Sequence, residues 1–299
     1  TGGILCSQNL WACERPVVYG YDDIDCLSDG LARIERDGKY GFIDKTGKVV
    51  IPLNYDLAWY FSEGLARVER NGKYGFIDNT GKVVIPLNYD GVGSFSEGLA
   101  AVERNGKWGF IDNTGKVVIP LKYDRAESFS EGLARVSQND KYGFVDKTGK
   151  VVIPLNYDSA ESFSEGLAVV RQNGKWGFID NTGKVVIPLN YDWTWSFSEG
   201  LAAVERNDKW GFIDNTGKVV IPLNYDLAWY FSEGLVAVRQ NGKWGFIDNT
   251  GKVVIPLKYD WVGSFYNGVA GVLDRSTGEA FYINRQGERL YWLGEPWFD

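Results

Sequence analysis

The chain has 299 residues, a formal net charge of −7 and an apolar fraction of 44%. This apolar share excludes an intrinsically disordered acidic chain, and no apolar run approaches the roughly 18 residues that a membrane span needs. Lys alternates with Asp and Glu and forms no basic stripe, so we expect no nucleic-acid partner.

The first 29 residues differ from the rest of the chain and carry its three cysteines, Cys6, Cys13 and Cys26. We expect them to form an N-terminal cap. Because the first residue is Thr and not Met, we interpret the chain as a processed or trimmed product. By spacing, Cys6 and Cys13 are the easier disulfide pair, with one thiol left over, as in an exported protein. The alternative is three buried thiols in the cap.

After the cap, the tetrapeptide Lys-Trp/Tyr-Gly-Phe recurs every 34 residues within a nearly identical segment. A fixed period of this length indicates a series of identical structural units and not one irregular core. We expect seven regular repeats over 30–267, then a degenerate eighth repeat and C-terminal cap over 268–299. The aromatic and glycine residues of the motif are Tyr40 with Gly41, Tyr74 with Gly75, Trp108 with Gly109, Tyr142 with Gly143, Trp176 with Gly177, Trp210 with Gly211, and Trp244 with Gly245.

One repeat predicts three strands joined by two tight turns. Strands at 65–70 and 73–78 flank Asn71-Gly72, a pair typical of the two-residue type I′ hairpin. Residues 79–81, Asn-Thr-Gly, predict a three-residue loop whose glycine is left-handed. We expect the third strand, 82–86, to end at its proline, because proline cannot donate to a ladder.

Side chains alternate across these strands and give two largely apolar faces. A sheet with two apolar faces has to be covered on both sides, most simply by its neighbours in the series. The motif glycine, here Gly75, leaves a dimple on one face. We predict that an aromatic side chain of the adjacent repeat fills this dimple.

The aromatic residue of the motif varies together with a residue on the preceding strand. Each Tyr copy carries Arg there, as in Arg67 with Tyr74, and each Trp copy carries Ala or Val, as in Ala101 with Trp108. The turn register makes the two residues diagonal neighbours on one face, and both combinations keep a similar volume. The Arg–Tyr version adds a cation–π contact. We interpret this rule as packing.

A tetrapeptide that does not repeat follows each Tyr-Asp, as in LAWY at 57–60 and RAES at 125–128. Its second residue is always Ala, Val or Thr, whereas its first and third vary widely, which predicts an extended fourth strand with one free face. We predict that this face binds a ligand, because exposed large apolar side chains mark binding surfaces. The alternatives are relaxed exposed sequence, or Trp side chains packed between repeats. The candidate ligand-binding residues are Trp59, Arg125, Glu127, Ser159, Glu161, Trp193, Trp195, Trp229 and Trp261.

The two ends are degenerate in different ways. Phe281 replaces the motif glycine in the last unit, and residues 1–29 match only half a repeat. Unlike ends favour an open array with caps over a closed ring. We therefore expect an all-β fold of tandem 34-residue antiparallel β-meander repeats in an open, capped, solenoid-like array. An eight-bladed β-propeller is the alternative.

The repeated string Lys-Trp/Tyr-Gly-Phe-Ile-Asp-x-Thr-Gly-Lys-Val-Val-Ile-Pro, with the later Phe-Ser-Glu-Gly-Leu-Ala, resembles the bacterial WG (KWG) repeat family over about residues 27–260. The resemblance implies a bacterial protein and a repeat number that varies among members, which fits an open array. It implies no assigned activity. We expect an extracellular or cell-surface location in a bacterium, with the cytoplasm as the alternative.

The composition argues against catalysis. Without His, neither a Ser-His-Asp nor a Cys-His arrangement can form, and the Cys spacing resembles no zinc site. Carboxylates recur in every repeat, whereas an active site is normally built once. We expect no enzyme, no cofactor and no metal, but a non-catalytic binding or scaffold protein for a glycan or protein ligand. The alternative is a self-assembling surface-layer or filament subunit, whose copies meet through the aromatic segment 291–298.

Overall fold

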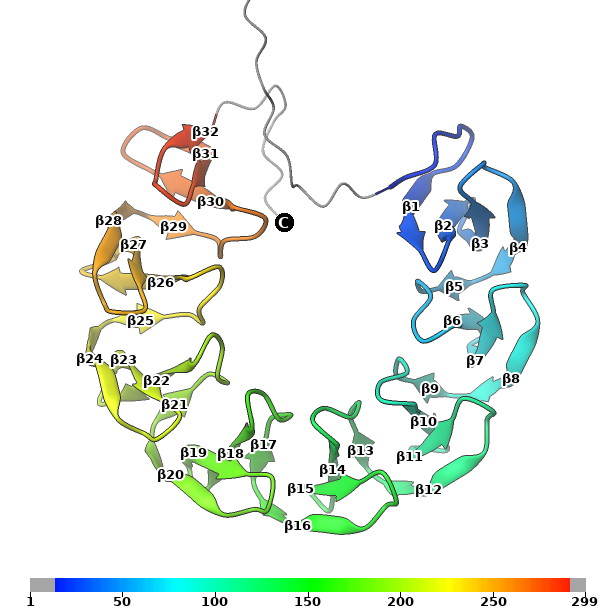
Figure 1. Ribbon diagram of the computed structural model, residues 1–299, viewed down its shortest axis with the longest axis horizontal. Coiled ribbons are helices and arrows are strands. Elements are labelled where there is room, and N and C mark those ends of the chain that lie inside the picture. Colours follow the sequence, from blue (N-terminus) through cyan, green and yellow to red (C-terminus); the bar gives the residue numbers. More distant parts are fainter. Residues whose placement is uncertain (1–13, 291–299) are drawn as a thin grey trace, which may run out of the picture. The chain divides into compact units, whose positions relative to one another are not determined.

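The computed structural model describes residues 14–290, which form eight four-stranded antiparallel sheets in succession along the chain (Figure 1). The predicted all-β fold of tandem repeats is confirmed. The chain divides into two compact units, residues 1–140 with 144–151 and residues 141–143 with 152–299, and each is described by itself. In the described part, no helix is long and apolar enough to cross a membrane.

Each sheet pairs its four strands in chain order, as a simple meander. The first four sheets contain β1 (Asp23–Ser28), β2 (Leu31–Arg36), β3 (Lys39–Asp44) and β4 (Val49–Tyr55); β5 (Leu57–Ala58), β6 (Leu65–Arg70), β7 (Lys73–Asp78) and β8 (Val83–Tyr89); β9 (Gly91–Val92), β10 (Leu99–Arg104), β11 (Lys107–Asp112) and β12 (Val117–Tyr123); and β13 (Arg125–Ala126), β14 (Leu133–Gln138), β15 (Lys141–Asp146) and β16 (Val151–Tyr157).

The last four sheets have the same layout. They contain β17 (Ser159–Ala160), β18 (Leu167–Gln172), β19 (Lys175–Asp180) and β20 (Val185–Tyr191); β21 (Trp193–Thr194), β22 (Leu201–Arg206), β23 (Lys209–Asp214) and β24 (Val219–Tyr225); β25 (Leu227–Ala228), β26 (Leu235–Gln240), β27 (Lys243–Asp248) and β28 (Val253–Tyr259); and β29 (Trp261–Val262), β30 (Val269–Asp274), β31 (Glu279–Asn284) and β32 (Arg289–Leu290).

The variable tetrapeptide supplies the first strand of the sheet that follows it. In the second sheet, Leu57 and Ala58 pair with Glu69 and Val68 of β6. One residue, Asp56, separates β5 from the preceding β4. The predicted fourth strand therefore exists, and it opens the next sheet.

The turns form as their residues predict. Asn71 and Gly72 have φ angles of 54° and 71°, as a type I′ turn requires, and Gly81 in the following loop has φ 85°. Glu63 and Gly64, with φ 52° and 78°, make a second left-handed turn. That turn joins the first and second strands of one sheet, β5 and β6.

The third predicted strand does not end at its proline. β8 continues through Pro86 to Tyr89, because an irregular stretch lets three residues, 86–88, lie opposite the single Gly75. A Cβ atom on Gly75 would lie 2.5 Å from the Ile85 carbonyl oxygen and 2.9 Å from the Leu87 nitrogen. The predicted filling by an aromatic side chain of the adjacent repeat was wrong, since backbone of the same sheet occupies the dimple.

The core lies between consecutive sheets within each unit. One face of the first sheet packs against the opposite face of the second, and Phe61 meets Phe42 edge to face with ring centroids 5.0 Å apart. Coverage of both sheet faces is thereby confirmed for these sheets. The cluster contains Leu31, Phe42, Ile51, Tyr55, Ala58, Phe61, Ala66, Val68 and Ile77.

The N-terminal segment substitutes for a missing neighbour. Val18, Tyr21, Ile24 and Leu27 cover the apolar face of the first sheet that a preceding sheet would cover elsewhere. The same segment supplies β1, so the predicted cap is also part of the first sheet. At the other end, Phe281 packs against the preceding sheet, 6.2 Å from the Tyr259 ring.

Cys26 is disulfide-bonded in the structure. The predicted pair, Cys6 and Cys13, lies outside the described residues. Because the chain holds three cysteines, a bond from Cys26 within the chain and a bond between Cys6 and Cys13 exclude one another.

Candidate functional site

The variable tetrapeptides have the predicted alternation of buried and exposed side chains. Their second residues are buried, as in Ala58 (2% exposed) and Val262 (0%), except for the half-buried Ala126, whereas the first and third residues face solvent to different degrees. We call these first and third positions the tetrapeptide surface. Its existence is observed, and its binding of a ligand stays a prediction.

The candidate residues differ in exposure. Trp193, Trp195 and Trp261 are 42%, 40% and 40% exposed, although large aromatic side chains are usually more buried. Trp59, Ser159 and Trp229 are half-buried. The exposed charged candidates are Arg125, Glu127 and Glu161.

Two of the half-buried candidates pack within their own sheet. Trp59 lies 6.1 Å from Tyr74, and the Arg67 guanidinium stacks 3.6 Å above the Trp59 ring. In the other unit, Trp229 meets Trp244 edge to face at 5.4 Å. These two Trp side chains therefore take part in the packing of their own sheets.

Arginine at the covarying position also links neighbouring sheets. The Arg67 Nη1 donates a 2.9 Å hydrogen bond to the carbonyl oxygen of Val92, on the first strand of the next sheet. Arg33 donates in the same way to Ala58 and lies over Tyr40 at 5.2 Å. The predicted cation–π contact with the motif Tyr thus occurs at Arg33, whereas Arg67 lies over Trp59.

Three Trp residues form a cluster in the second unit. Trp193 lies 5.1 Å from Trp176 of the preceding sheet and 6.4 Å from Trp195, with interplanar angles of 58° and 76°. The Trp195 indole N–H donates a 3.2 Å hydrogen bond to the Ala228 carbonyl of the following sheet. We call Trp176, Trp193 and Trp195 the Trp cluster. Its two exposed rings are fixed by contacts with two different neighbouring sheets.

Glu205 lies directly opposite Trp193 of this cluster, and it was not among the residues predicted from the sequence. The register pairs Trp193 of β21 with Glu205 of β22, which is in turn paired with Trp210 of β23. Directly paired residues share one face of the sheet. Burial, together with the charges of Asp192 and Asp208, raises the pKa of the Glu205 carboxyl. Counting two residues back from the Asn207-Asp208 turn locates Glu205 on β22, but only the pairing of β21 places Trp193 beside it.

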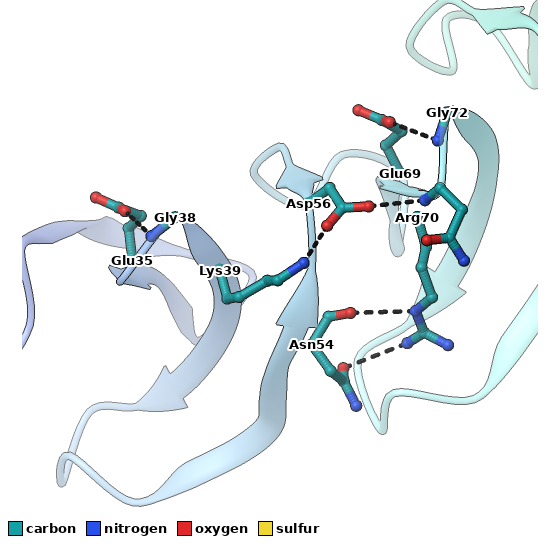
Figure 2. A network of polar contacts seen from close by, with 9 residues as sticks. Glu35, Gly38, Lys39, Asn54, Asp56, Glu69, Arg70 and Gly72 are labelled. Carbon is teal, nitrogen blue, oxygen red and sulfur yellow. Dashed lines mark hydrogen bonds and ion pairs between the residues drawn. The ribbon is translucent and has the colours of Figure 1, made fainter.

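The motif lysine belongs to a polar ladder between sheets (Figure 2). Lys39 of the first sheet forms an ion pair with Asp56, whose other carboxylate oxygen accepts a 2.7 Å hydrogen bond from the Asn71 backbone N–H of the second sheet. Arg70 adds a 3.1 Å hydrogen bond to the Asn54 carbonyl. The same ion pair recurs as Lys73–Asp90, Lys107–Asp124, Lys141–Asp158, Lys175–Asp192, Lys209–Asp226 and Lys243–Asp260.

The Ser-Glu-Gly segment forms a second ladder. The Ser96 hydroxyl donates a 2.8 Å hydrogen bond to the Phe129 carbonyl of the next repeat. In the other unit, the Glu199 carboxylate accepts a 2.8 Å hydrogen bond from the Gly234 backbone N–H, also one repeat further on. The invariant polar residues of the repeat therefore have structural partners. What varies from repeat to repeat is the tetrapeptide surface.

These ladders make the fold sensitive to acid. The hydrogen bond from Lys39, followed by that from the Asn71 N–H, lowers the pKa of Asp56, and the equivalent Asp residues behave alike. A carboxylate with a lowered pKa in the folded state stabilises the fold above its unfolded pKa, and this contribution disappears as pH falls through the folded value. We expect the free energy of unfolding to drop steeply below about pH 4, as measured by urea denaturation at several pH values.

The Asp56→Asn variant provides the control for this pH dependence. It removes one titrating group and keeps an acceptor for the Asn71 N–H, so the drop below about pH 4 should be shallower. An unchanged slope would contradict the assignment.

Other clusters of the described residues offer less chemistry. In residues 14–290, no group of three or more His, Cys, Asp or Glu side chains is placed to hold a metal ion. A pocket of about 360 Å³ lies between the seventh and eighth sheets, beside Leu235, Asp248 and Arg285. It contains none of the predicted residues.

Comparison with solved structures supports the fold assignment. A eukaryotic initiation factor is 13% identical with a TM-score of 0.60, over 92% of this chain and 89% of that one. It is a β-propeller protein, which agrees with the eight-bladed alternative. Hsv2 of Kluyveromyces lactis (10% identity, TM-score 0.43, 74% and 90% covered) and the dihydro-heme d1 dehydrogenase NirN (14%, 0.45, 92% and 76%) are less similar.

Comparison with curated proteins finds no match for the sequence. The family model of the WG containing repeat matches eight consecutive segments that together run from residue 19 to residue 274. These segments begin or end at the motif aromatic residues, from Tyr40 to Trp244. The chain therefore belongs to the WG repeat family.

Proposed function

We propose that this WG repeat protein is a non-catalytic binding protein that holds a glycan or protein ligand along its tetrapeptide surface. The observation that carries the proposal is the pair Trp193 and Trp195. Both rings are about two-fifths exposed, and both are held rigidly by Trp176 and by the Ala228 carbonyl. Rigid exposed aromatic side chains give contact area at low cost in conformational entropy.

The distribution of sequence variation supports the same proposal. The invariant Lys, Asp, Ser and Glu residues form the ladders between sheets, and the invariant apolar residues form the core. The exposed residues of the tetrapeptide surface belong neither to the ladders nor to the core. They can therefore change without loss of the fold. Within each unit, from the second sheet on, every sheet contributes one such position pair, and this repetition suits a long ligand.

Glycan and peptide arrays probed with the purified protein test this proposal. We expect the double variant Trp193→Ala/Trp195→Ala to lose most of the signal at every bound ligand, because the contact area of both rings is lost. The matched control is Val83→Ala/Val117→Ala, which removes exposed apolar side chains from the fourth strands of two sheets. Equal array signals for wild type and the Trp double variant would contradict the proposal.

The self-assembly alternative depends on residues 291–298. They lie outside the described residues.

A further inference from the structure

We propose that Trp193, Trp195 and Glu205 form a recognition site for an organic cation, best an alkylated ammonium group carried by the ligand. We call these three residues the cation notch. This inference depends on the proposed binding function and names the chemistry that the same surface recognises.

The two exposed indole rings stand nearly perpendicular to one another, in an edge-to-face arrangement. Their planes meet at 76° and their centroids are 6.4 Å apart. A cation over the open face of either ring lies inside the reach of about 6 Å for a cation–π contact. Trp176 packs against Trp193, and the Arg171 guanidinium already lies 5.7 Å above the Trp176 ring. The exposed rings of Trp193 and Trp195 are left for the ligand.

Glu205 supplies the negative charge of the notch. In the second sheet, the equivalent Glu69 accepts a 2.9 Å hydrogen bond from the Gly72 N–H of its own turn. Asp208 occupies that turn position in the sixth sheet, and no described residue donates a hydrogen bond to the Glu205 carboxylate. A half-buried carboxylate without a partner costs free energy that a bound cation would recover.

The combination occurs in one described sheet. The other first-strand residues lie opposite different partners, such as Gly91 opposite Glu103 and Trp261 opposite Leu273. Among the described pairs between the first and second strands of a sheet, Trp193 with Glu205 is the one that sets an indole ring directly across from a carboxylate.

The ring arrangement favours a cation over the flat face of a sugar. A pyranose stacks best on a single exposed ring face or on coplanar rings, whereas these rings stand nearly at right angles. A quaternary ammonium group has no N–H groups that need acceptors, so exposed indole faces and one carboxylate suit it.

Titration with choline, followed by tryptophan fluorescence and calorimetry, tests the inference on the full chain. The matched neutral probe is 3,3-dimethylbutan-1-ol, which has the same shape without the charge. We expect choline to bind at least about tenfold more tightly than the neutral alcohol, because cation–π and ionic attraction are lost with the charge. Equal affinity of the two probes would overturn the cation assignment, as would the absence of choline binding.

Variants locate the binding. We expect Trp193→Ala and Glu205→Gln each to weaken choline binding at least about fivefold. Trp261→Ala and Glu103→Gln are the controls, since Trp261 lies opposite Leu273 and the first-strand residue opposite Glu103 is Gly91. Circular dichroism verifies that every variant is folded. If the controls weaken binding as much as the notch variants do, the site is elsewhere and the proposal fails.

The outcome is distinguishable from failure of the proposed function. A neutral glycan or peptide that needs Trp193 and Trp195 on the arrays, without any choline binding, leaves the binding function standing and removes the cation assignment. If choline binds, competition by a trimethyllysine peptide or by a choline-substituted glycan identifies the class of carrier.

Discussion

Replacing Gly75 by Ala is expected to destabilise the protein by about 3 kcal/mol or more, measured by urea denaturation. A methyl group there would meet the carbonyl oxygen of Ile85 at 2.5 Å and the backbone of Pro86 and Leu87 at 2.9 Å. All of these are main-chain atoms, which cannot move aside as a flexible side chain can. The strand through Pro86 would have to straighten, and its pairing with β7 would be lost.

Gly93→Ala is the matched control in the next sheet. A Cβ there would lie 3.6 Å from both the Ala101 Cβ and the Ser128 Oγ, which is ordinary contact. We expect its free energy of unfolding to stay within about 1 kcal/mol of wild type. If Gly75→Ala is tolerated as well as Gly93→Ala, the role assigned to the motif glycine is wrong.

Arg67→Ala should destabilise the protein by about 1–3 kcal/mol, and Tyr74→Trp should recover part of this loss. The Arg67 side chain stacks on Trp59 and donates to the Val92 carbonyl, so its removal leaves a cavity and an acceptor without its donor. The next sheet combines Ala101 with Trp108 at the same positions, and both pack well there.

A double-mutant cycle on Arg67 and Tyr74 measures this compensation. Tyr74→Trp should be favourable in the Arg67→Ala background and unfavourable in wild type, where Arg67 occupies the space of the larger ring. If the two substitutions are simply additive, the packing interpretation of the covariation does not hold.

The parts of the fold that could be predicted depend on neighbouring residues in the sequence. Asn71-Gly72 specifies its turn through two local φ angles, and that turn fixes the pairing of Arg70 with Lys73. The alternation of the tetrapeptide is likewise a local pattern, and the buried Ala58 confirms it. For such features the sequence contains the whole physical cause.

The parts that were missed depend on residues brought together by the sheet. Taken alone, Pro86 predicts the end of a strand. The strand continues past it because the facing Gly75 has no side chain and leaves room. Similarly, Asp56 looks like a turn residue until Lys39 and Asn71 are seen on either side of it. Glu205 was missed for the same reason. Its neighbour Trp193 lies on a strand whose register cannot be predicted from a turn motif.

The single-residue connection between sheets has a consequence for how each sheet finds its native neighbour during folding. Because the facing surfaces are chemically almost the same in every repeat, a sheet gains nearly equal free energy from stacking on any other sheet. Side-chain complementarity therefore cannot tell the third sheet from the sixth. A tether as short as Asp90, between β8 and β9, forbids every partner except the adjacent one. The short connections therefore decide which sheets become neighbours. The exposed residues can then change in evolution without changing the order of the sheets.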